Sequence, residues 1–509
     1  MILISSLLRM WVAATLELGN DEVYYQTYSR YLQWNYFDHP PMVAILIRLS
    51  TFNLFFHQAL FSRLGSICCA AAGTWVVYEI GKKIQSERAG WIAAILYNTS
   101  FYSSVIAGTF ILPDSPQLIF WLASIYLMVS ILENFHAGVK TLTFFILLGI
   151  CIGLCTMSKV HGVFLWIGFG GYILFHERLL LKLPGFWIAM LLSLLIISPI
   201  IWWNYNNHFI TYQYHQSRIN FWGSHPDPDH LLQQLLGSVF YNNPVNFILC
   251  ISLVYFISKG DTKSLPAEYP LFLWLSLPLI CILAWTSLFS ETLPHWSGPA
   301  YISLSILLSC RLDTNFSNAS RNRWLKTSGL VYLSVVVLGV FGIQYLPVQI
   351  GSQEMDRRGT GDVTLDMVGW QRFSQKLDSL VKADSASGIM KPGAFILSDY
   401  WFPAAHLDYY YAIPYHHSLL AIGNIGNIHH FAWLNQRTAR LQTGTDAYFI
   451  YPSNYYGPPG QSLKDIFGRI DDSLLIPQYR GGNLVRYFVV IRLHEFKGDS
   501  LDYLVPGLK

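Results

Sequence analysis

Long apolar runs constrain this chain more than any other feature of its sequence. A helix that crosses a bilayer needs about 20 predominantly apolar residues, and the sequence offers about 11 or more such runs. Hydrophobic residues make up 53% of the 509 residues and charged residues only 12%, against roughly 25% charged residues in a soluble domain. We therefore expect an α-helical polytopic membrane protein. The expected spans are 3–18, 59–79, 89–108, 115–134, 142–157, 161–176, 185–203, 236–257, 269–289, 297–310 and 327–346.

Lysine and arginine are distributed unevenly over the loops between these runs. Cytoplasmic loops are enriched in Lys and Arg, so the richer loops are predicted to be cytoplasmic. The loop 21–41 and the C-terminal part then lie outside, and we expect an integral protein of a bacterial inner (cell) membrane. The richer loops hold Lys82, Lys83, Arg88, Lys140, Arg178, Lys182, Lys259, Lys263, Arg311, Arg321, Arg323 and Lys326, and the poorer loops hold Arg30, Arg48, Arg63, Lys159 and Arg218.

The two ends of the chain differ in character. The first run starts at Met1 without a small-residue cleavage site, so we expect a shortened first span and not a removed signal peptide. From about residue 350 the sequence is more polar, and no later run is long enough to span a bilayer. We expect a transmembrane domain over 1–349, whose first outer loop is about 19–58, and an extracytoplasmic α/β domain over 350–509. The expected strands are 394–398, 446–451 and 485–492, and the expected helices are 403–412 and 429–441.

Charge and cysteine content argue against other classes of protein. A net charge of +3 without a basic tail argues against nucleic-acid binding. The seven cysteines all fall in apolar runs, so we interpret them as small buried hydrophobes and not as a disulfide framework or zinc site. The run 225–230 contains His and Asp, but Asp227 as an N-cap before Pro228 explains it better than a metal site. We expect no metal and no cofactor.

An acidic pair follows the first span directly. Asp21 and Glu22 are adjacent, and adjacent residues on a helix do not share a face, so at most one would point into a cavity. Ionisable groups gathered between spans usually mark a site of chemistry. The alternative is structural, with Asn20 or Asp21 as the N-cap of a helix over 22–31.

The sequence Tyr-Phe-Asp-His-Pro-Pro at 36–41 predicts a stiff elbow before a helix. Pro40 holds His39 extended, and Pro41 suits the first turn of the following helix. Such a helix N-terminus binds anions, and a histidine beside it can donate to a phosphate oxygen. A capping turn at the membrane interface is the alternative.

Further charges stand alone in other outer loops. Asp114 could cap the next helix or converge with Asp21 and Asp38 on one cavity. Lys159, in a tight hairpin, could bind a phosphate, although snorkelling to lipid head groups is the alternative. Arg218, which has aromatic neighbours, could clamp a phosphate or stack on a sugar.

The ordered set of motifs resembles the GT-C membrane glycosyltransferases. The set comprises a first span, Asp21-Glu22 with tyrosines close behind, Tyr-Phe-Asp-His-Pro-Pro, and Pro-Asp at 113–114. The branch that it resembles most holds protein O-mannosyltransferases and lipid A aminoarabinose transferases. The resemblance is strongest over residues 10–165 and weaker around a Pro-His-Trp loop near residue 300.

The resemblance implies a transferase that takes one sugar from a polyprenyl-phosphate donor, usually with inversion. The acceptor would be a hydroxyl of lipid A, of a glycan or of a protein. Carried over by position, Asp21 matches the catalytic base, with Glu22 beside it, and Asp38 and Asp114 match supporting acids. The expected contacts to the sugar or acceptor are Tyr24, Tyr25, Glu291 and His295.

One position departs from the family. His39 stands where aminoarabinose transferases have a lysine that contacts the donor phosphate, and Asp38 stands where they have a glutamate. A neutral histidine donates one hydrogen bond without a full charge. We therefore expect Lys159 or Arg218 to bind the phosphate as well. The sequence does not determine which sugar the donor carries.

Two other functions are alternatives for a membrane protein with these motifs. A transporter or flippase of lipid-linked sugars would have interrupted spans in matching halves of the chain, and the sequence shows no such repeat. An enzyme that joins whole glycans, such as a ligase or oligosaccharyl transferase, would share the fold. The sequence contains no sequon-reading motif that favours it.

Overall fold

The computed structural model describes residues 1–218, 226–455 and 462–498, and the chain forms two compact units. The first, which we call the helical unit, comprises Met1–Ala13 and Leu32–Val336. The second, the sheet unit, comprises Ala14–Tyr31 and Val337–Lys509. A short segment near the N-terminus therefore belongs with the C-terminal part of the chain.

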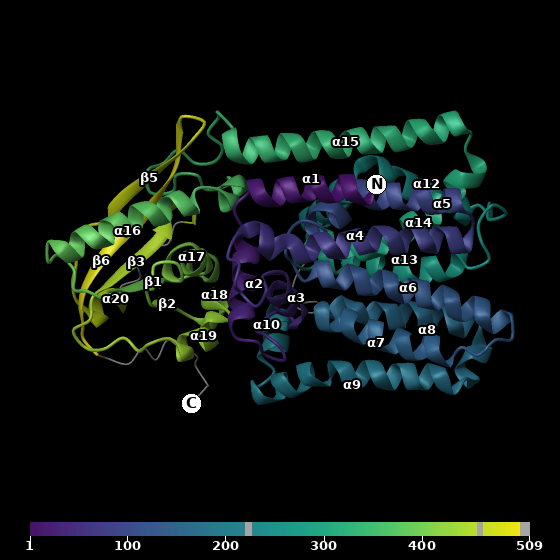
Figure 1. The fold of residues 1–509 in the computed structure, drawn as a ribbon, viewed down its shortest axis with the longest axis horizontal. Coiled ribbons are helices and arrows are strands. Elements are labelled where there is room, and N and C mark those ends of the chain that lie inside the picture. The colour runs from purple at the N-terminus through teal and green to yellow at the C-terminus, as the bar shows by residue number, and fades with distance from the viewer. Residues whose placement is uncertain (219–225, 456–461, 499–509) are drawn as a thin grey trace. The chain divides into compact units, whose positions relative to one another are not determined.

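Helices of several lengths build the helical unit (Figure 1). Among the described residues, five helices (α4, α6, α9, α13 and α15) are long and apolar enough to cross a membrane, or up to seven spans if two bent pairs count as one span each. The helical membrane architecture is confirmed, while the count of about 11 spans stays a prediction. The helices are α1 (Ile2–Thr15), α3 (Met42–Ser50), α4 (Ala59–Ile84), α5 (Glu87–Thr99), α6 (Asp114–His136), α7 (Leu142–Ser158), α8 (Phe164–His176), α9 (Pro184–Asn206), α10 (Ile210–Arg218), α11 (Pro228–Tyr241), α12 (Pro244–Ser258), α13 (Tyr269–Ser287), α14 (Gly298–Asn315) and α15 (Asn318–Tyr345).

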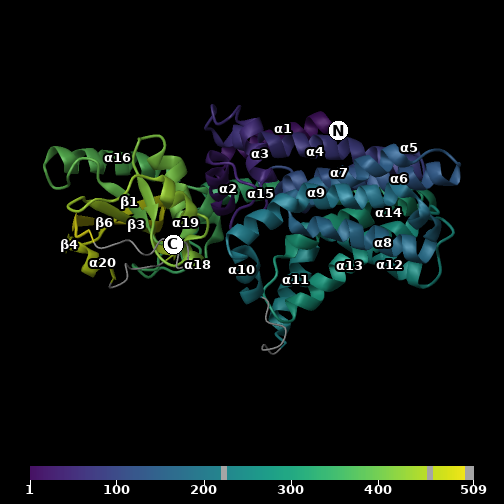
Figure 2. The ribbon, with the colours of Figure 1, turned by 90° about the horizontal axis from the view of Figure 1, so that it is seen from below.

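Small residues let the helices approach closely. Helix α7 packs between α6 and α9 (Figures 1 and 2). A Cβ on Gly149 would lie 2.4 Å from the carbonyl oxygen of Ala189 on α9, and one on Gly153 would lie 2.8 Å from a side-chain atom of Ile196. Lipid tails are as apolar as leucine, so close van der Waals packing of this kind is what holds membrane helices together.

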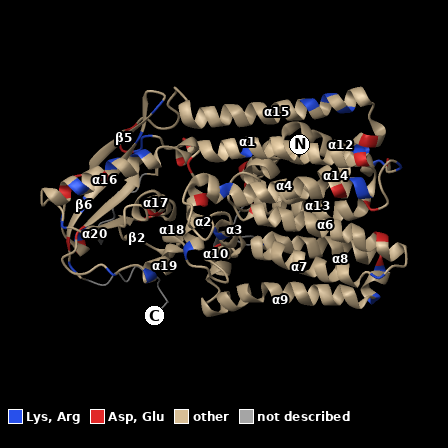
Figure 3. Ribbon diagram, in the orientation of Figure 1, with Lys and Arg blue, Asp and Glu red and all other residues tan. Residues whose placement is uncertain are grey.

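Charged residues gather at the ends of these helices. Figure 3 shows most Lys and Arg of the helical unit around the end where α14 finishes and α15 begins. Ion pairs at that end join Arg88 to Asp313 and Arg311 to Asp261. The asymmetry that the sequence predicts is therefore present in three dimensions, while the side of the membrane stays a prediction.

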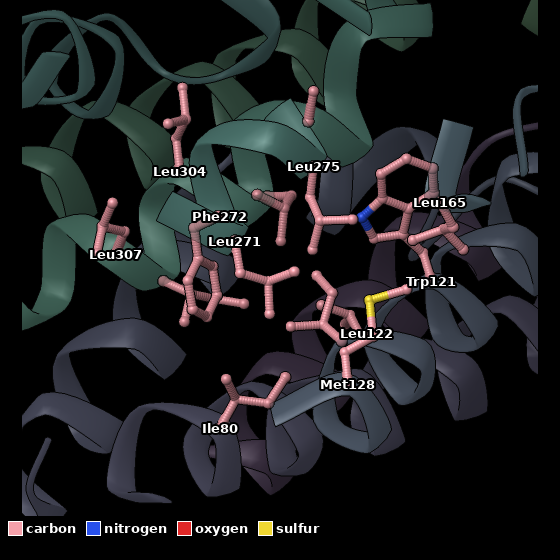
Figure 4. Packing of buried hydrophobic residues seen from close by; sticks show 14 of the residues in the cluster. Ile80, Trp121, Leu122, Met128, Leu165, Leu271, Phe272, Leu275, Leu304 and Leu307 are labelled. Atoms are coloured by element: carbon pink, nitrogen blue, oxygen red, sulfur yellow. The ribbon is translucent and has the colours of Figure 1, made fainter. Parts of the chain in front are cut away.

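A buried apolar core fills the space between α4, α6, α8, α13 and α14 (Figure 4). Trp121 is its largest fully buried side chain, and its indole N–H donates to the Ser303 hydroxyl at 3.0 Å. Burying the indole with its donor satisfied avoids the cost of an unpaired polar group. All seven cysteines are free, but Cys68 and Cys281 are exposed, so their predicted burial is wrong.

The expected span 236–257 is not one continuous helix. It breaks between α11 and α12, whose axes are bent by 107°. Asn243 adopts φ 65° at the break, Pro244 begins α12, and the Asn243 side chain accepts from the Val245 N–H at 3.1 Å. A left-handed residue followed by proline ends one helix and starts another, which explains the bend.

A mixed sheet organises the second unit. Its strands run in the order β2-β1-β3-β6-β4, and β5 also pairs with β6. β1 is parallel to β2 and β3, whereas β6 is antiparallel to β3, β4 and β5. The three predicted strands are confirmed as β1, β3 and β6. The strands are β1 (Phe395–Ser398), β2 (Leu419–Ala421), β3 (Ala447–Pro452), β4 (Phe467–Ile470), β5 (Leu474–Arg480) and β6 (Asn483–Phe496).

Helices complete the sheet unit. The predicted helix 403–412 is confirmed as α17 and the π-helical turn that follows it. The predicted helix 429–441 is wrong in length, because His429 at φ 51° separates two short helices and the second ends in a 3₁₀ turn. The helices are α2 (Asn20–Arg30), α16 (Trp370–Ala386), α17 (Trp401–Leu407), η6 (Asp408–Ala412), α18 (Ile425–Ile428), α19 (Phe431–Leu434), η7 (Asn435–Arg437) and α20 (Ser462–Ile466).

Candidate functional site

A buried ion pair marks the candidate site of the helical unit. Asp114 begins α6, and Lys159 directly follows α7. The Lys159 ammonium donates to both carboxylate oxygens of Asp114, at 3.0 and 2.8 Å. Their side chains are only 5% and 3% exposed. Lys159 therefore does not snorkel to lipid head groups, and that alternative is wrong.

The environment of this pair favours a functional role. Removing two charges from water costs more than many ion pairs recover, so a buried pair is weak support for stability. Charged groups between membrane helices are, in contrast, a frequent mark of a functional site. The negative charge of Asp114 also lies in the first turn of α6, where the helix dipole favours it.

Tyr102 adds a third member that the sequence did not reveal. Its hydroxyl donates to Asp114 Oδ1 at 3.1 Å. Tyr102 opens the π-helical turn η1 (Tyr102–Ile106), and such turns often occur at functional sites. A Cβ on Gly298 would lie 2.3 Å from the Tyr102 ring, so only glycine leaves room for the ring at the start of α14.

Three histidines lie within electrostatic reach of the pair. His39, in the predicted elbow, is half-buried and senses Asp38, Lys159 and Asp114. Burial lowers the pKa of His39 to about 4, opposed by the Asp38 carboxylate. Burial also lowers the pKa of His295 to about 4, and Lys159 acts in the same direction. Both rings are therefore neutral at pH 7 and can donate hydrogen bonds without adding charge.

His161 is the third histidine. Its ring lies 5.4 Å from the Trp296 ring, whose centre is 5.9 Å from the Lys159 ammonium. Its Nδ1 is buried and has no hydrogen-bond partner among the described residues. His161 lies two residues after Lys159 in the same predicted hairpin, but nothing in the sequence assigned it a role.

The remaining predicted residues of the helical unit are placed as follows. Asp38 is half-buried beside His39, and its backbone oxygen lies 3.4 Å from the ring of His215. Glu291 is exposed and accepts from the Gln233 amide at 3.4 Å. Arg218 ends α10, but its side chain lies outside the described residues.

The acidic pair Asp21-Glu22 belongs to the sheet unit. The N-cap of α2 is Gly19, so neither Asn20 nor Asp21 caps the helix as expected. The Glu22 carboxylate instead accepts from the Gly19 N–H at 2.9 Å, which satisfies a donor at the helix start. Asp21 is exposed in the first turn of α2.

The neighbours of this pair pack inside the sheet unit. The side-chain Oδ1 of Asn20 lies 2.9 Å from His406 Nε2, and the ring of His406 stacks on Trp370 with ring centres 4.1 Å apart. Tyr24 is buried, and its hydroxyl accepts from the His430 N–H at 3.1 Å. Tyr25 is buried beside Tyr24, with ring centres 5.8 Å apart. The sheet unit thus fixes the helix that carries Asp21.

The alternative at 225–230 is settled for its described part. The Asp227 side chain accepts from the Asp229 N–H at 2.9 Å as the N-cap of α11, as predicted. Within residues 1–218, 226–455 and 462–498, no three His, Cys, Asp or Glu side chains are placed to share a metal ion.

The chemistry of the cluster in the helical unit is that of an anion site. A lysine ammonium has three donors, and Asp114 occupies at most two of them among the described residues. The neutral histidines supply further donors in a place where burial strengthens electrostatic interactions. The arrangement can therefore hold a group with oxygen acceptors and a negative charge, such as a phosphate.

Comparisons with known proteins agree with the motifs. Residues 38–203 match the family model described as dolichyl-phosphate-mannose-protein mannosyltransferase. That range contains His39, Asp114 and Lys159. The lipid A galacturonosyltransferase RgtD of Rhizobium johnstonii is 20% identical over 289 residues, which cover 56% of this chain and 59% of that relative. The match therefore spans less than two thirds of the relative's length.

Solved structures share the fold. ArnT from Cupriavidus metallidurans in the apo state aligns with a TM-score of 0.60 at 12% identity, covering 96% of both chains. The same protein bound to undecaprenyl phosphate aligns with a TM-score of 0.62 at 14% identity, covering 96% of this chain and 97% of that one. Identities this low establish the fold and not the activity. Residues 38–203 therefore resemble the mannosyltransferase family, and the chain as a whole has the fold of ArnT.

Proposed function

We propose that this protein transfers one sugar from a polyprenyl-phosphate donor to a hydroxyl of an acceptor. The observation that carries the proposal is the buried pair of Asp114 and Lys159 with Tyr102 and histidines around it. A desolvated cluster of donors suits a lipid-linked phosphate, which can enter it from the bilayer. The ArnT structure with the same fold was solved with undecaprenyl phosphate bound.

In this proposal the donor phosphate binds at Lys159 and His39. Lys159 supplies the positive charge, and the low pKa of His39 makes its ring a neutral donor. Asp114 orients the ammonium through two hydrogen bonds and reduces its net charge. The phosphate can therefore be held without being bound so tightly that the product stays in place. Arg218 remains a proposed further contact from the sequence.

The transfer step follows from general base chemistry. The Asp21 carboxylate takes the proton of the acceptor hydroxyl, and the acceptor oxygen forms a bond to the anomeric carbon. The bond from that carbon to the phosphate oxygen breaks, and its electron pair stays on the phosphate. The configuration at the anomeric carbon is inverted. Lys159 and His39 stabilise the charge that develops on the leaving polyprenyl phosphate. Glu22 holds the first turn of α2, and Asp38 supports the site.

The acceptor is proposed only as a chemical class. Lipid A is the acceptor named for the curated relative, and a glycan or a protein hydroxyl are the other classes. We propose sugar or acceptor contacts for Glu291, His295, Tyr24 and Tyr25. The gathering of Lys and Arg at one end of the helical unit supports an active side outside a bacterial inner membrane.

A comparison of cells with and without the protein tests the function. Mass spectrometry of membrane glycolipids and glycoproteins should show one sugar missing from one pool when the protein is absent. An Asp21→Asn variant should fail to restore that sugar although it accumulates at the normal level, because an amide cannot accept the proton. Full restoration by Asp21→Asn would contradict the role of Asp21, and unchanged pools would contradict the function.

A further inference from the structure

The sheet unit contains a large cavity that the proposed function does not use. Its volume is 680 Å³, which is within the range of pockets that hold small ligands. Its walls come from the start of α16, from β5 and from the ends of α1 and α15. The lining residues that matter here are Glu17, Gln344, Arg372, Lys376, Tyr479 and Arg480.

The chain reaches this cavity directly from the membrane. Helix α15 is a candidate span and ends at Tyr345, which lines the cavity. The Gln344 amide donates to the Thr15 backbone oxygen at 3.0 Å, so the ends of α15 and α1 are held together there. Tyr345 and Tyr479 are 62% and 56% exposed. Exposed tyrosines where a span ends are typical of the interface between membrane and water.

One wall of the cavity is cationic. Arg372 and Lys376 are four residues apart on α16, so they lie on one face of the helix, and both are exposed. Neither forms an ion pair within the described parts of the chain. Lys376 donates to the Pro477 backbone oxygen at 3.2 Å, which places its ammonium beside β5. The Glu17 carboxylate senses the charge of Arg372 but forms no ion pair with it, so the two exposed cations of this wall can attract an anionic ligand.

A buried donor at the end of β5 also belongs to the lining of the cavity. Arg480 is 2% exposed and binds Asp362 at 2.8 Å, yet its Nε is buried without a hydrogen-bond partner among the described residues. An unpaired buried donor costs free energy unless a ligand or water satisfies it. The Glu17 carboxylate accepts from the Trp370 and Gln371 N–H groups at 2.8 and 3.2 Å, so the start of α16 already attracts one anionic group.

Amide side chains complete the lining. Gln344, Gln371, Gln375 and Gln478 all face this space as lining residues. Gln478 is already bonded to Arg486 and to the Val368 backbone oxygen, and Gln344 donates to Thr15. The exposed amides of Gln371 and Gln375 each offer a donor and an acceptor, which suits the hydroxyl groups of a sugar. The cavity therefore combines cations for a phosphate, amides for a sugar and a position at the end of a membrane helix.

We propose that this cavity binds the phosphorylated sugar head group of the acceptor lipid. The inference rests on the proposed function, because it assigns that function a glycolipid acceptor instead of a protein. The acyl chains stay in the bilayer while Arg372 and Lys376 hold a phosphate and the exposed glutamines contact the sugar. Residues of the sheet unit then select the acceptor.

Binding of lipid A, used as a phosphorylated glucosamine lipid, tests the proposal on the full chain in detergent micelles. The Arg372→Gln/Lys376→Gln variant removes two positive charges from the cavity. The Lys382→Gln/Lys464→Gln variant removes two exposed lysines that do not line it, as a matched control. Native mass spectrometry should show lipid A binding about tenfold to 100-fold more weakly in the first variant, since charge-assisted hydrogen bonds are lost. The control should bind like the unmodified protein.

Three comparison ligands show which part of lipid A the cavity recognises. Lipid A without its phosphates should bind at least about tenfold more weakly than intact lipid A. Inorganic phosphate and phosphatidylglycerol should not compete at equal concentration. Equal binding in both variants, or phosphatidylglycerol binding as tightly as lipid A, would overturn the proposal.

Polyprenyl phosphate separates this proposal from the function on which it rests. If it fails to bind while lipid A binds through Arg372 and Lys376, the donor assignment fails and the cavity assignment stands. If it binds and lipid A does not, the cavity assignment alone fails.

Discussion

At the residue scale, variants of the Lys159–Asp114 pair allow its contribution to stability to be measured separately from its contribution to phosphate binding. Lys159→Gln leaves the Asp114 carboxylate buried without its cation, so the free energy of unfolding should fall by about 3 kcal/mol. The double variant Asp114→Asn/Lys159→Gln removes both charges and should recover most of that loss. Thermal unfolding in detergent measures these differences.

Binding of polyprenyl phosphate gives the second readout for the same variants. Both should bind it at least about tenfold more weakly than the unmodified protein, because the ammonium is missing in each. A double variant that is stable and binds polyprenyl phosphate normally would show that the pair is structural and not part of a phosphate site.

The pKa of His39 predicts how stability depends on pH. His39 has a pKa of about 4 in the folded protein against a usual value of 6.5. Between pH 6.5 and pH 4 the unfolded chain therefore binds more protons, and His39 makes the folded state less stable as the pH falls through this window. Above pH 6.5 this contribution is complete and constant.

A His39→Gln variant isolates that contribution. Its melting temperature should fall less steeply between pH 6.5 and pH 4 than that of the unmodified protein, because glutamine does not titrate. His57→Gln is a suitable control, since His57 is an exposed histidine in the same unit. Identical slopes for the unmodified protein and His39→Gln would show that His39 is protonated as easily as an exposed ring.

Residues with unusual chemistry could be found from the sequence, and their partners could not. Asp114, Lys159 and His39 stood out because charges and histidines are rare beside apolar runs. Tyr102 is one tyrosine among 31. Its role depends on a π-helical turn and on the space left by Gly298, and neither has a sequence signature. His161 lies in the same predicted hairpin as Lys159, but only its unpaired Nδ1 distinguishes it from a packed histidine.

At the element scale, local pattern decided what could be predicted. The strands β1 and β3 are short apolar runs with turn residues around them, and their bounds were predicted to within one residue. Strand β6 begins two residues earlier and ends four residues later than predicted. The bend between α11 and α12 was missed because apolar runs flank it on both sides, so that a window of span length averages over it. The signal was Asn242-Asn243-Pro244, since the residue before proline disfavours the helical region.

Helix α2 shows the limit of element prediction. Its existence follows from the sequence, but its surroundings do not. Eight consecutive residues from Glu22 to Ser29 are buried, so the helix is covered on all sides rather than on one face. A polar sequence normally predicts an exposed surface helix. Contacts with Trp401, His429 and His430, some 400 residues away, reverse that expectation.

At the scale of the whole molecule, the two units are interlaced along the chain. Residues 14–31 fold with residues 337–509, although more than 300 residues of the helical unit lie between them. Hydropathy distinguishes membrane spans from polar segments, but it cannot indicate which polar segments pack together. The expected boundary near residue 350 marks a change in composition, whereas the sheet unit also includes the segment that carries Asp21 and Glu22.

This interlacing predicts that the segment with Asp21 cannot fold without the C-terminal part. In a chain that ends at residue 349, α2 loses the bond from the His430 N–H to Tyr24 and the ion pair between Arg30 and Asp408, whose atoms lie 2.6 and 2.8 Å apart. A free helix of this length is only marginally stable in water. Hydrogen exchange of the α2 amides should therefore be at least about 100-fold faster, and sugar transfer should be lost.

A chain that ends at residue 498 is the matched control for this truncation. It removes only residues outside the described part and keeps every strand of the sheet, so α2 should stay protected and transfer should continue. Exchange in α4 of the helical unit should be slow in both truncated chains, because its core does not include the removed residues. Slow exchange of α2 in the chain that ends at residue 349 would mean that α2 folds without the sheet. The fold of the segment that carries Asp21 would then be independent of the C-terminal part of the chain.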